Sequence, residues 1–372
     1  MLADRTRWAA YRDSLARTLY PGMVVVELGS GLSTLAFEAV RMGEARVHCI
    51  ETNAIIEQAK KLARWLGVED RIAFHRAYSH DVVLEEPADI LVADLRGITP
   101  LYENHIRTIL DARLRFLKPD GCLIPRRDDL WVAPISSPQL WAKSVGLFGR
   151  VPRGLGLELL QETVAGQPAR ATTDDDSELL AAPHKWFSLS YREVKEPHAQ
   201  GKCEFRFLAA AKCHGFLLWF STELAPGIGF DNSPQRKDSI YGQLFFALPE
   251  EVPIGAGDTL TLDMRANLVG GSYFWRWDST FHRVGSEAPM HYRQGSSLEV
   301  MPTLECLHTG ADHSTPALTE EGEIALSILS RLDGNTSIKR IADDLDSARP
   351  SQTGIIERVR ELAREYAILP KP

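Results

Sequence analysis

The sequence predicts an α/β domain with a mostly parallel, doubly wound sheet, then an antiparallel β-barrel or sandwich, then a small C-terminal helical domain. Short β-branched runs alternate with helical spacing over residues 1–132. Many short alternating runs punctuated by Gly and Pro fill residues 133–307, and helical spacing returns over residues 317–372. A chain of 372 residues is also too long for one ordinary hydrophobic core, which favours two or three domains.

The periodicity places the individual elements. Strands are predicted in the first domain at residues 23–28, 46–51, 72–76, 90–94 and 121–125, and helices at residues 32–42, 54–66 and 102–116. Later antiparallel strands are predicted at residues 202–211, 215–222 and 259–266, with an inserted excursion at 155–177. A linker is expected at 308–316, followed by amphipathic helices at 319–332, 338–345 and 352–366.

The composition excludes several classes of protein. No run of about eighteen uncharged apolar residues exists, so no membrane span is expected, and the charged first residues do not resemble a signal peptide. Five widely spaced cysteines without a CxxC pair favour a reducing cytoplasm over a disulfide framework, and the histidines lack metal-ligand spacing, so no metal is expected. A net charge of −8 argues against nucleic-acid binding and suits a cationic substrate.

The strongest local signal is the run VVVELGSG, from Val24 to Gly31, a buried strand that enters a glycine-rich turn. Glycines in such a turn let the backbone approach a ligand closely. Glu51 ends the next strand, where a doubly wound sheet places a carboxylate on a ribose diol. A dinucleotide also fits this pair, although Ser33 at the third glycine position weakens that interpretation, and a purely structural turn is the alternative.

From Asp4 to about Gly285 the chain resembles the protein arginine methyltransferases. The stretch DRTRWAAYRDSL is similar to the family helix that covers the cofactor, and ELGSGLSTLAFEAVRMGEARVHCIETN is similar to its first two cofactor motifs. The resemblance implies a class I methyltransferase domain followed by a β-barrel, with S-adenosylmethionine as cofactor, S-adenosylhomocysteine as product and no metal. The cofactor residues that it implies are Arg7 on the methionine carboxylate, Glu27, Gly29 and Gly31 around the cofactor, Glu51 on the ribose, and Ser79 and His80 at the adenine.

The sequence ADLRGITPLYEN, residues 93–104, resembles the family loop that carries two glutamates nine positions apart. Asp94 and Glu103 have that spacing, and the resemblance implies that they are catalytic. Two carboxylates can grip a guanidinium by charge-assisted hydrogen bonds and align it for methyl transfer. The alternative is an ordinary helix N-terminus that carries acidic residues, which the helix dipole favours.

Three features depart from the family pattern. Asp94 is one methylene shorter than the family glutamate, and Arg96 replaces an apolar residue, where it can pair with Asp94 or Glu103. The Thr-His-Trp loop of the family appears as Ser239-Ile240-Tyr241, so the histidine is missing and Tyr241 is the candidate to replace part of its role by hydrogen bonding.

The resemblance also implies partners. In this family an arm inserted in the barrel drives dimerisation, and residues 155–177, with Leu155, Leu157, Leu159 and Leu160, lie where that arm would be, so a homodimer is expected. Residues 317–372 resemble the PqqD-type domains that bind leader peptides by strand addition, and a winged-helix-like structural cap is the alternative.

The function predicted from all of this is S-adenosylmethionine-dependent methylation of a guanidino or related nitrogen on a peptide or protein. Two alternatives stay open. One is a small-molecule methyltransferase of natural-product biosynthesis, and the other is a non-catalytic scaffold that keeps the fold, which the missing histidine and Arg96 motivate.

Overall fold

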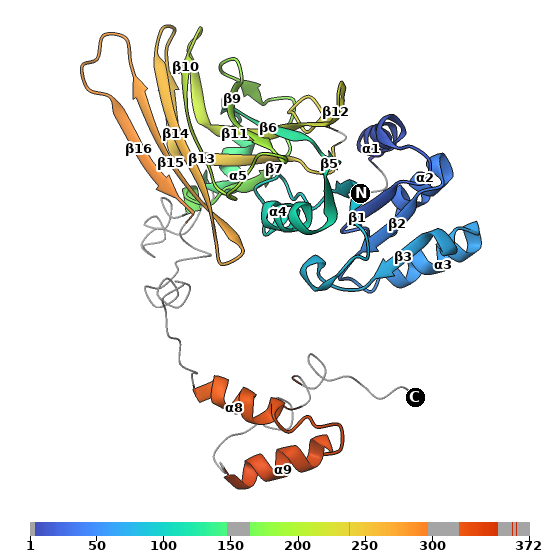
Figure 1. Ribbon diagram of the computed structural model, residues 1–372. Helices are drawn as coiled ribbons and strands as arrows, with labels where there is room; N and C mark the ends of the chain where they lie inside the picture. The colour runs from blue at the N-terminus through green and yellow to red at the C-terminus, as the bar shows by residue number, and fades with distance from the viewer. Residues whose placement is uncertain are drawn as a thin grey trace. The chain divides into compact units, whose positions relative to one another are not determined.

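The computed structural model describes residues 4–146, 164–237, 239–296 and 320–348, together with Val359 and Leu362. The chain forms two compact units, Met1–Met301 and Pro302–Pro372. The four arm leucines and the expected linker at 308–316 lie outside the described residues, as does most of the third C-terminal helix. The first unit contains both the α/β part and the β-rich part of the chain (Figure 1).

The α/β part is built on a five-stranded parallel sheet in the order β3-β2-β1-β4-β5. The strands are β1 (Val24–Leu28), β2 (Arg46–Ile50), β3 (Ile72–His75), β4 (Ala88–Ala93) and β5 (Leu117–Ile124). The accompanying elements are α1 (Arg5–Thr18), α2 (Thr34–Gly43), α3 (Ile56–Leu66), α4 (His105–Phe116) and the short 3₁₀ turns η1 (Glu69–Arg71) and η2 (Ser79–Asp81). These bounds confirm the predicted α/β class, with element ends that differ by a few residues from the sequence pattern.

The two faces of β1 explain why this strand is an unbroken apolar run. Val25 packs in a cluster with residues of α1, α2 and α3, while Val26 packs in a second cluster with Ile106 and Ile109 of α4. A parallel strand covered by helices on both faces has no solvent side, so alternate residues must both be apolar. From β1 the chain first adds β2 and β3 on one side of β1 and then adds β4 and β5 on the other side. The switch point therefore lies between β1 and β4, and doubly wound sheets bind ligands at such a point.

The β-rich part contains two antiparallel sheets. One has the order β10-β14-β15-β16, and the other has the order β7-β13-β11-β6-β8, with β12 paired to β11 and β9 paired to β6. Their elements are β6 (Arg127–Ser136), α5 (Pro138–Ser144), β7 (Ala169–Ala171), β8 (Glu178–Leu179), β9 (His184–Ser190), β10 (Ala199–Arg206), β11 (Ala211–Ala225), β12 (Ile228–Asp231), β13 (Gln243–Ile254), β14 (Thr259–Val269), β15 (Ser272–His282) and β16 (Met290–Gly295).

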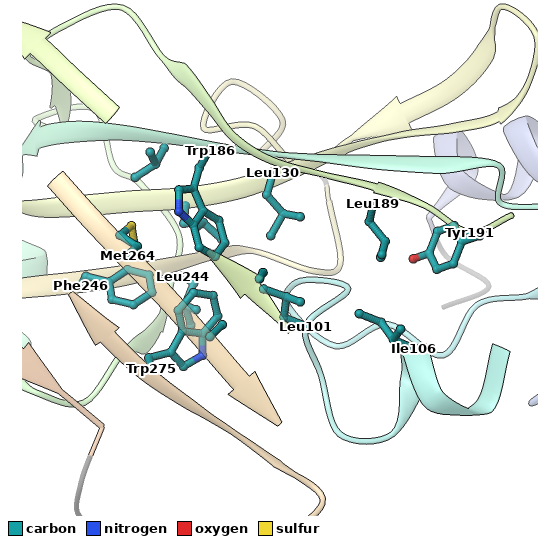
Figure 2. Close-up of a cluster of buried hydrophobic side chains, with 14 of the residues drawn as sticks. Leu101, Ile106, Leu130, Trp186, Leu189, Tyr191, Leu244, Phe246, Met264 and Trp275 are labelled. Carbon is teal, nitrogen blue, oxygen red and sulfur yellow. The ribbon is translucent and has the colours of Figure 1, made fainter. Parts of the chain in front are cut away.

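One hydrophobic core joins the two parts of this unit. Trp186, Phe246 and Trp275 from the antiparallel sheets belong to the same buried cluster as Ile106 of α4 (Figure 2). Tyr191, which follows β9, lies at the α4 end of the cluster beside Ile106 (Figure 2). Apolar burial is therefore continuous from the parallel sheet into the antiparallel sheets, and polar side chains at the junction of the two parts are packed away from water.

The second unit contains α8 (Glu320–Leu329) and α9 (Ile338–Ala348). Ile328, Ile341 and Leu345 pack with Val359 and Leu362 in a small separate core. Asp333 forms the turn between the helices by accepting hydrogen bonds from the backbone of Asn335 and Thr336, at 2.8 and 2.7 Å. Both helices were expected from the sequence, and the spacing of the apolar residues accounts for them.

Candidate active site

A cavity of about 610 Å³ lies at the carboxyl ends of the parallel strands. Its walls come from the segments that follow β1, β2, β3 and β4, and from the first turns of α4. The lining residues include Gly29, Glu51, Thr52, Tyr78, Ser79, His80, Leu95, Glu103, Asn104, His105, Arg107, Thr108 and Asp111. Five residues predicted for the site, namely Gly29, Glu51, Ser79, His80 and Glu103, therefore face one space.

The glycine turn after β1 is held by Glu51. Gly29 has φ +63° and Gly31 has φ +52°, a region that residues with a Cβ seldom adopt. A Cβ on Gly29 would lie 2.3 Å from Leu95 Cδ2, so any larger residue would have to displace that side chain. The Glu51 carboxylate accepts hydrogen bonds from the backbone N–H of Gly31 at 2.9 Å and of Asn53 at 2.8 Å. These bonds fix the carboxylate at the edge of the cavity while leaving it further acceptor capacity.

Glu27 lies beneath this turn and does not line the cavity. Its side chain accepts a hydrogen bond from the backbone N–H of Ala36 at 3.2 Å, in the first turn of α2. Ser33, the residue that caps this helix, makes no side-chain capping bond, so Glu27 supplies the acceptor that the helix start needs. Burial raises the pKa of Glu27 to about 8.

The segment after β3 contributes an aromatic wall. The rings of Tyr78 and His80 stack with centroids 5.3 Å apart and planes 14° from parallel. Both residues line the cavity, and both are exposed to solvent. A planar, polar-edged surface of this kind suits a heteroaromatic ring.

Asp94 follows β4 and is bound by groups of the chain itself. Its Oδ2 accepts hydrogen bonds from Arg7 and, at 2.7 Å, from the hydroxyl of Tyr241. Its Oδ1 accepts a hydrogen bond from Arg96 at 2.9 Å. Burial alone would raise the pKa of Asp94, but Arg96 and Arg7 hold that pKa below its usual value. The hydrogen bond predicted for Tyr241 is present, whereas Arg7 and Asp94 are absent from the lining of the cavity.

Arg96 is the centre of a buried polar network, and the sequence prediction that it pairs with Asp94 is confirmed. Its guanidinium also donates two hydrogen bonds to Asp128 on β6, at 2.8 and 2.9 Å. It donates further to the hydroxyls of Tyr11 at 2.8 Å and Thr222 at 2.9 Å. Because the Arg96 side chain is fully buried, it needs all of these acceptors to offset the loss of hydration.

The network continues to the start of α4 through Tyr191. The Tyr191 hydroxyl lies 2.5 Å from Asp128 Oδ2 and 2.7 Å from His105 Nε2. Only 2% of the His105 surface is exposed, and burial lowers its pKa to about 3, so the imidazole is neutral at physiological pH.

Glu103 contrasts with Asp94, because its side chain is exposed. Its backbone has φ +41°, which is strained for any residue with a Cβ. Glu103 lines the main cavity and also an adjoining cavity of about 340 Å³, whose walls include Tyr102, Tyr273 and Trp275. This backbone conformation therefore places an exposed carboxylate, beside Tyr102, at the boundary between two spaces.

Three groups of the site were not predicted from the sequence. Asp128 and Tyr191 complete the buried network, and His105 lies in the cavity wall. Asp128 belongs to the charged start of β6, Arg127-Asp128-Asp129, and two adjacent acids ahead of an apolar run were an available signal for it. Asn104, Arg107, Thr108 and Asp111 recur at helical spacing on α4, which was a signal for a polar face toward the cavity.

Among the described residues, no cluster of His, Cys, Asp and Glu has the arrangement of a metal site. Within the same residues, no helix is long and apolar enough to cross a bilayer.

No family model matches the chain. It is 26% identical over 247 residues to the "Probable protein arginine N-methyltransferase 6" of Arabidopsis thaliana, covering 64% of this chain and 56% of that protein. It is 24% identical over 280 residues to the protein arginine N-methyltransferase 6 of Xenopus laevis, covering 71% of this chain and 81% of that protein.

Solved structures show the same fold. The Trypanosoma brucei PRMT1 enzyme-prozyme heterotetrameric complex with AdoHcy superposes with a TM-score of 0.72 at 22% identity, over 79% of this chain and 95% of that chain. Arabidopsis thaliana protein arginine methyltransferase 10 gives a TM-score of 0.70 at 18% identity over the same shares. In sequence this chain is therefore similar to protein arginine N-methyltransferases, and it shares the fold of their solved structures.

Proposed function

We propose that the chain is an S-adenosylmethionine-dependent methyltransferase that modifies arginine side chains of peptides or proteins. The observation that carries this proposal is the shared cavity, which Gly29 and Glu51 line from one side and Glu103 from the other. A carboxylate suited to a ribose diol and an exposed carboxylate suited to a cation then act on one space. The names of the sequence relatives support the same activity.

The cavity fits the cofactor. Its volume lies in the range of about 300–1,000 Å³ that is usual for ligand sites. Glu51 has acceptor capacity for the ribose hydroxyls, and Tyr78, Ser79 and His80 form a wall suited to adenine. Arg7 does not line this cavity and presents Nε and Nη2 to Asp94, but a guanidinium has five donors, so we assign the methionine carboxylate to its remaining donors.

The chemistry that S-adenosylmethionine supplies is a methyl group on a sulfonium. Transfer breaks one S–C bond and forms one N–C bond, giving S-adenosylhomocysteine, and the methylated nitrogen releases one proton to solvent. Glu103 accepts hydrogen bonds from the guanidinium, orients it and stabilises its charge near the methyl group. Asp94 anchors Arg7 and Tyr241 in the wall beneath the site.

The finer partners belong to the same proposal. The C-terminal unit, which has its own small core, is the candidate to bind a leader peptide. The chain is expected to act as a homodimer. Its expected location is the cytoplasm. Deletion of residues 317–372 tests the leader-peptide role. It should raise the KM for a leader-bearing substrate and leave the turnover of a short arginine peptide unchanged. Equal KM values for both forms of the enzyme would remove the leader role.

A specific observation favours a second candidate, a non-catalytic protein that keeps the fold. Asp94 is neutralised by two arginines of the chain itself, so one of the two expected loop acids is not free. This candidate predicts cofactor binding without methyl transfer to any peptide.

The test is a calorimetric titration with S-adenosylhomocysteine, followed by transfer of a radiolabelled methyl group to short peptides that contain one arginine or one lysine. Saturable binding and transfer only to the arginine peptide are expected. Transfer to neither peptide, with binding intact, would favour the non-catalytic candidate. Absence of binding at millimolar concentration would remove both.

A further inference from the structure

Three carboxylates of the described residues line the main cavity, and the proposed function uses only two of them. Glu51 lies at the glycine turn, and Glu103 lies just before α4. The third is Asp111, which lies on α4 nearly two turns, or roughly 9 Å, beyond the start of the helix. Its side chain keeps 39% of its surface exposed and lines the cavity, so a ligand there can reach it.

Arg115 holds the carboxylate of Asp111 in one orientation. From one turn further along α4, its Nε donates to Asp111 Oδ1 at 2.9 Å and Oδ2 at 3.1 Å, and its Nη2 donates to Oδ2 at 2.6 Å. The guanidinium also lies over the ring of Phe116, 4.5 Å from the centroid. A carboxylate offers about four acceptor positions, so Asp111 keeps capacity for a further donor.

The same guanidinium ties Asp111 to the segment that carries the aromatic wall of the cavity. Nη2 of Arg115 donates to Ser79 O at 2.6 Å, and Nη1 donates to Val82 O at 2.9 Å. Ser79 begins η2 and stands in the sequence between the two stacked rings of the wall. Because one nitrogen atom bonds both Ser79 O and Asp111 Oδ2, the Asp111 carboxylate lies beside the place assigned to adenine.

We propose that Asp111 recognises the adenine of the cofactor by accepting a hydrogen bond from its exocyclic amino group. This inference rests on the proposed function. The ring nitrogens of adenine accept hydrogen bonds and its amino group donates them, so a carboxylate beside the wall can pair only with the amino group. Arg115 is the positioning residue, because it bonds the carboxylate and the wall segment at once.

A comparison of two ligands tests the contact. S-adenosylhomocysteine is titrated by calorimetry beside its analogue in which unsubstituted purine replaces adenine, so that only the amino group is missing. The wild-type protein should bind S-adenosylhomocysteine about tenfold more tightly, as expected for a hydrogen bond to a partly exposed charged group. Asp111→Ala should bind the two compounds equally, to within about twofold. A merely structural role of Asp111 would weaken both ligands alike and keep the tenfold ratio.

Two further variants define the roles. Asp13→Ala on α1 is the matched control, because Asp13 also accepts hydrogen bonds from a neighbouring arginine at the surface and does not line the cavity. It should keep the wild-type ratio. Arg115→Lys keeps the charge but cannot bond a carboxylate and two carbonyls together, so it should lower the ratio part of the way. Thermal unfolding confirms that each variant is folded.

The outcomes separate this inference from the proposed function. Collapse of the ratio in Asp111→Ala supports the contact, whether or not the protein transfers a methyl group to a peptide. A tenfold ratio in both the wild type and Asp111→Ala overturns it while the cofactor site stands, and so does equal binding of the two ligands by the wild type. An unchanged ratio in Arg115→Lys removes the positioning role of Arg115. Binding of neither ligand at millimolar concentration overturns the proposed function and this inference together.

Discussion

The guanidinium of Arg96 and the carboxylate of Asp128 form two parallel hydrogen bonds of 2.8 and 2.9 Å inside the core of the first unit. Arg96 lies in the loop after β4 of the parallel sheet, and Asp128 lies on β6 of an antiparallel sheet. Neither side chain has any exposed surface. This pair thereby ties the loop that carries Glu103 to the β-rich part of the chain.

Replacement of Arg96 by methionine should strongly destabilise the protein. It leaves the Asp128 carboxylate buried without its cation, for which the expected cost is about 3–5 kcal/mol. Urea unfolding followed by tryptophan fluorescence measures the loss. Adding Asp128→Asn should recover part of it, because the uncompensated charge is then removed. The exposed Arg265, 3.7 Å from Asp263, is the control, and Arg265→Met should cost at most about 0.5 kcal/mol. Equal losses at the two arginines would contradict this assignment.

Replacement of Glu51 by alanine should weaken cofactor binding. The variant loses a charge-assisted hydrogen bond to the ribose, and also the acceptor for Gly31 and Asn53 in the glycine turn. The expected loss is about 1.5–3 kcal/mol, or roughly ten- to a hundredfold in affinity, by titration calorimetry with S-adenosylhomocysteine. Glu57→Ala on α3 is the matched control, since Glu57 forms a surface ion pair with the nearby Lys60 and does not line the cavity. Wild-type affinity in Glu51→Ala would remove this residue from the site.

Two replacements of Glu103 should separate its chemistry from its backbone strain. Glu103→Gln should abolish methyl transfer and leave cofactor affinity unchanged. Glu103→Gly should also abolish transfer, yet unfold at a higher temperature than the wild type, because glycine relieves the positive φ at a gain of about 1 kcal/mol. Methyl transfer assays and thermal unfolding make the comparison. A fully active Glu103→Gln enzyme would falsify the role of this carboxylate.

The buried imidazole of His105 should make the protein sensitive to acid. Its pKa is lowered to about 3 in the folded state, so the unfolded chain binds one proton more than the folded chain between pH 6.5 and about 3. The free energy of unfolding therefore falls as the pH falls through this window, by about 1.4 kcal/mol per pH unit from this group.

Urea unfolding at several pH values between 7 and 4 tests this linkage. The slope with pH should be smaller in His105→Gln than in the wild type by that amount. His282→Gln, which removes an exposed histidine at the end of β15, should keep the wild-type slope. Parallel curves for the wild type and His105→Gln would show that His105 is solvated.

The strands, the glycine turn and the acids that line the cavity could be predicted from the sequence, because each depends on neighbours along the chain. Val24–Leu28 alternates between two buried faces and so reads as an unbroken apolar run. The turn at Gly29 follows directly from the end of that strand, and Glu51 and Glu103 stand at element ends that the periodicity locates.

The partners of the buried groups were decided only by the tertiary structure. The sequence offered Arg96 two candidate partners, Asp94 and Glu103, and the fold gave it Asp94 together with Asp128, which lies 32 positions away. His105 meets Tyr191 from a distance of 86 positions. Hydrogen bonds and ion pairs act only at contact distance, and contact between remote segments is set by how the parallel and antiparallel sheets pack around a common core. Local sequence thus determined which residues could act at this site, while packing determined that Asp94 is held by the chain itself and that Glu103 and His105 line the cavity.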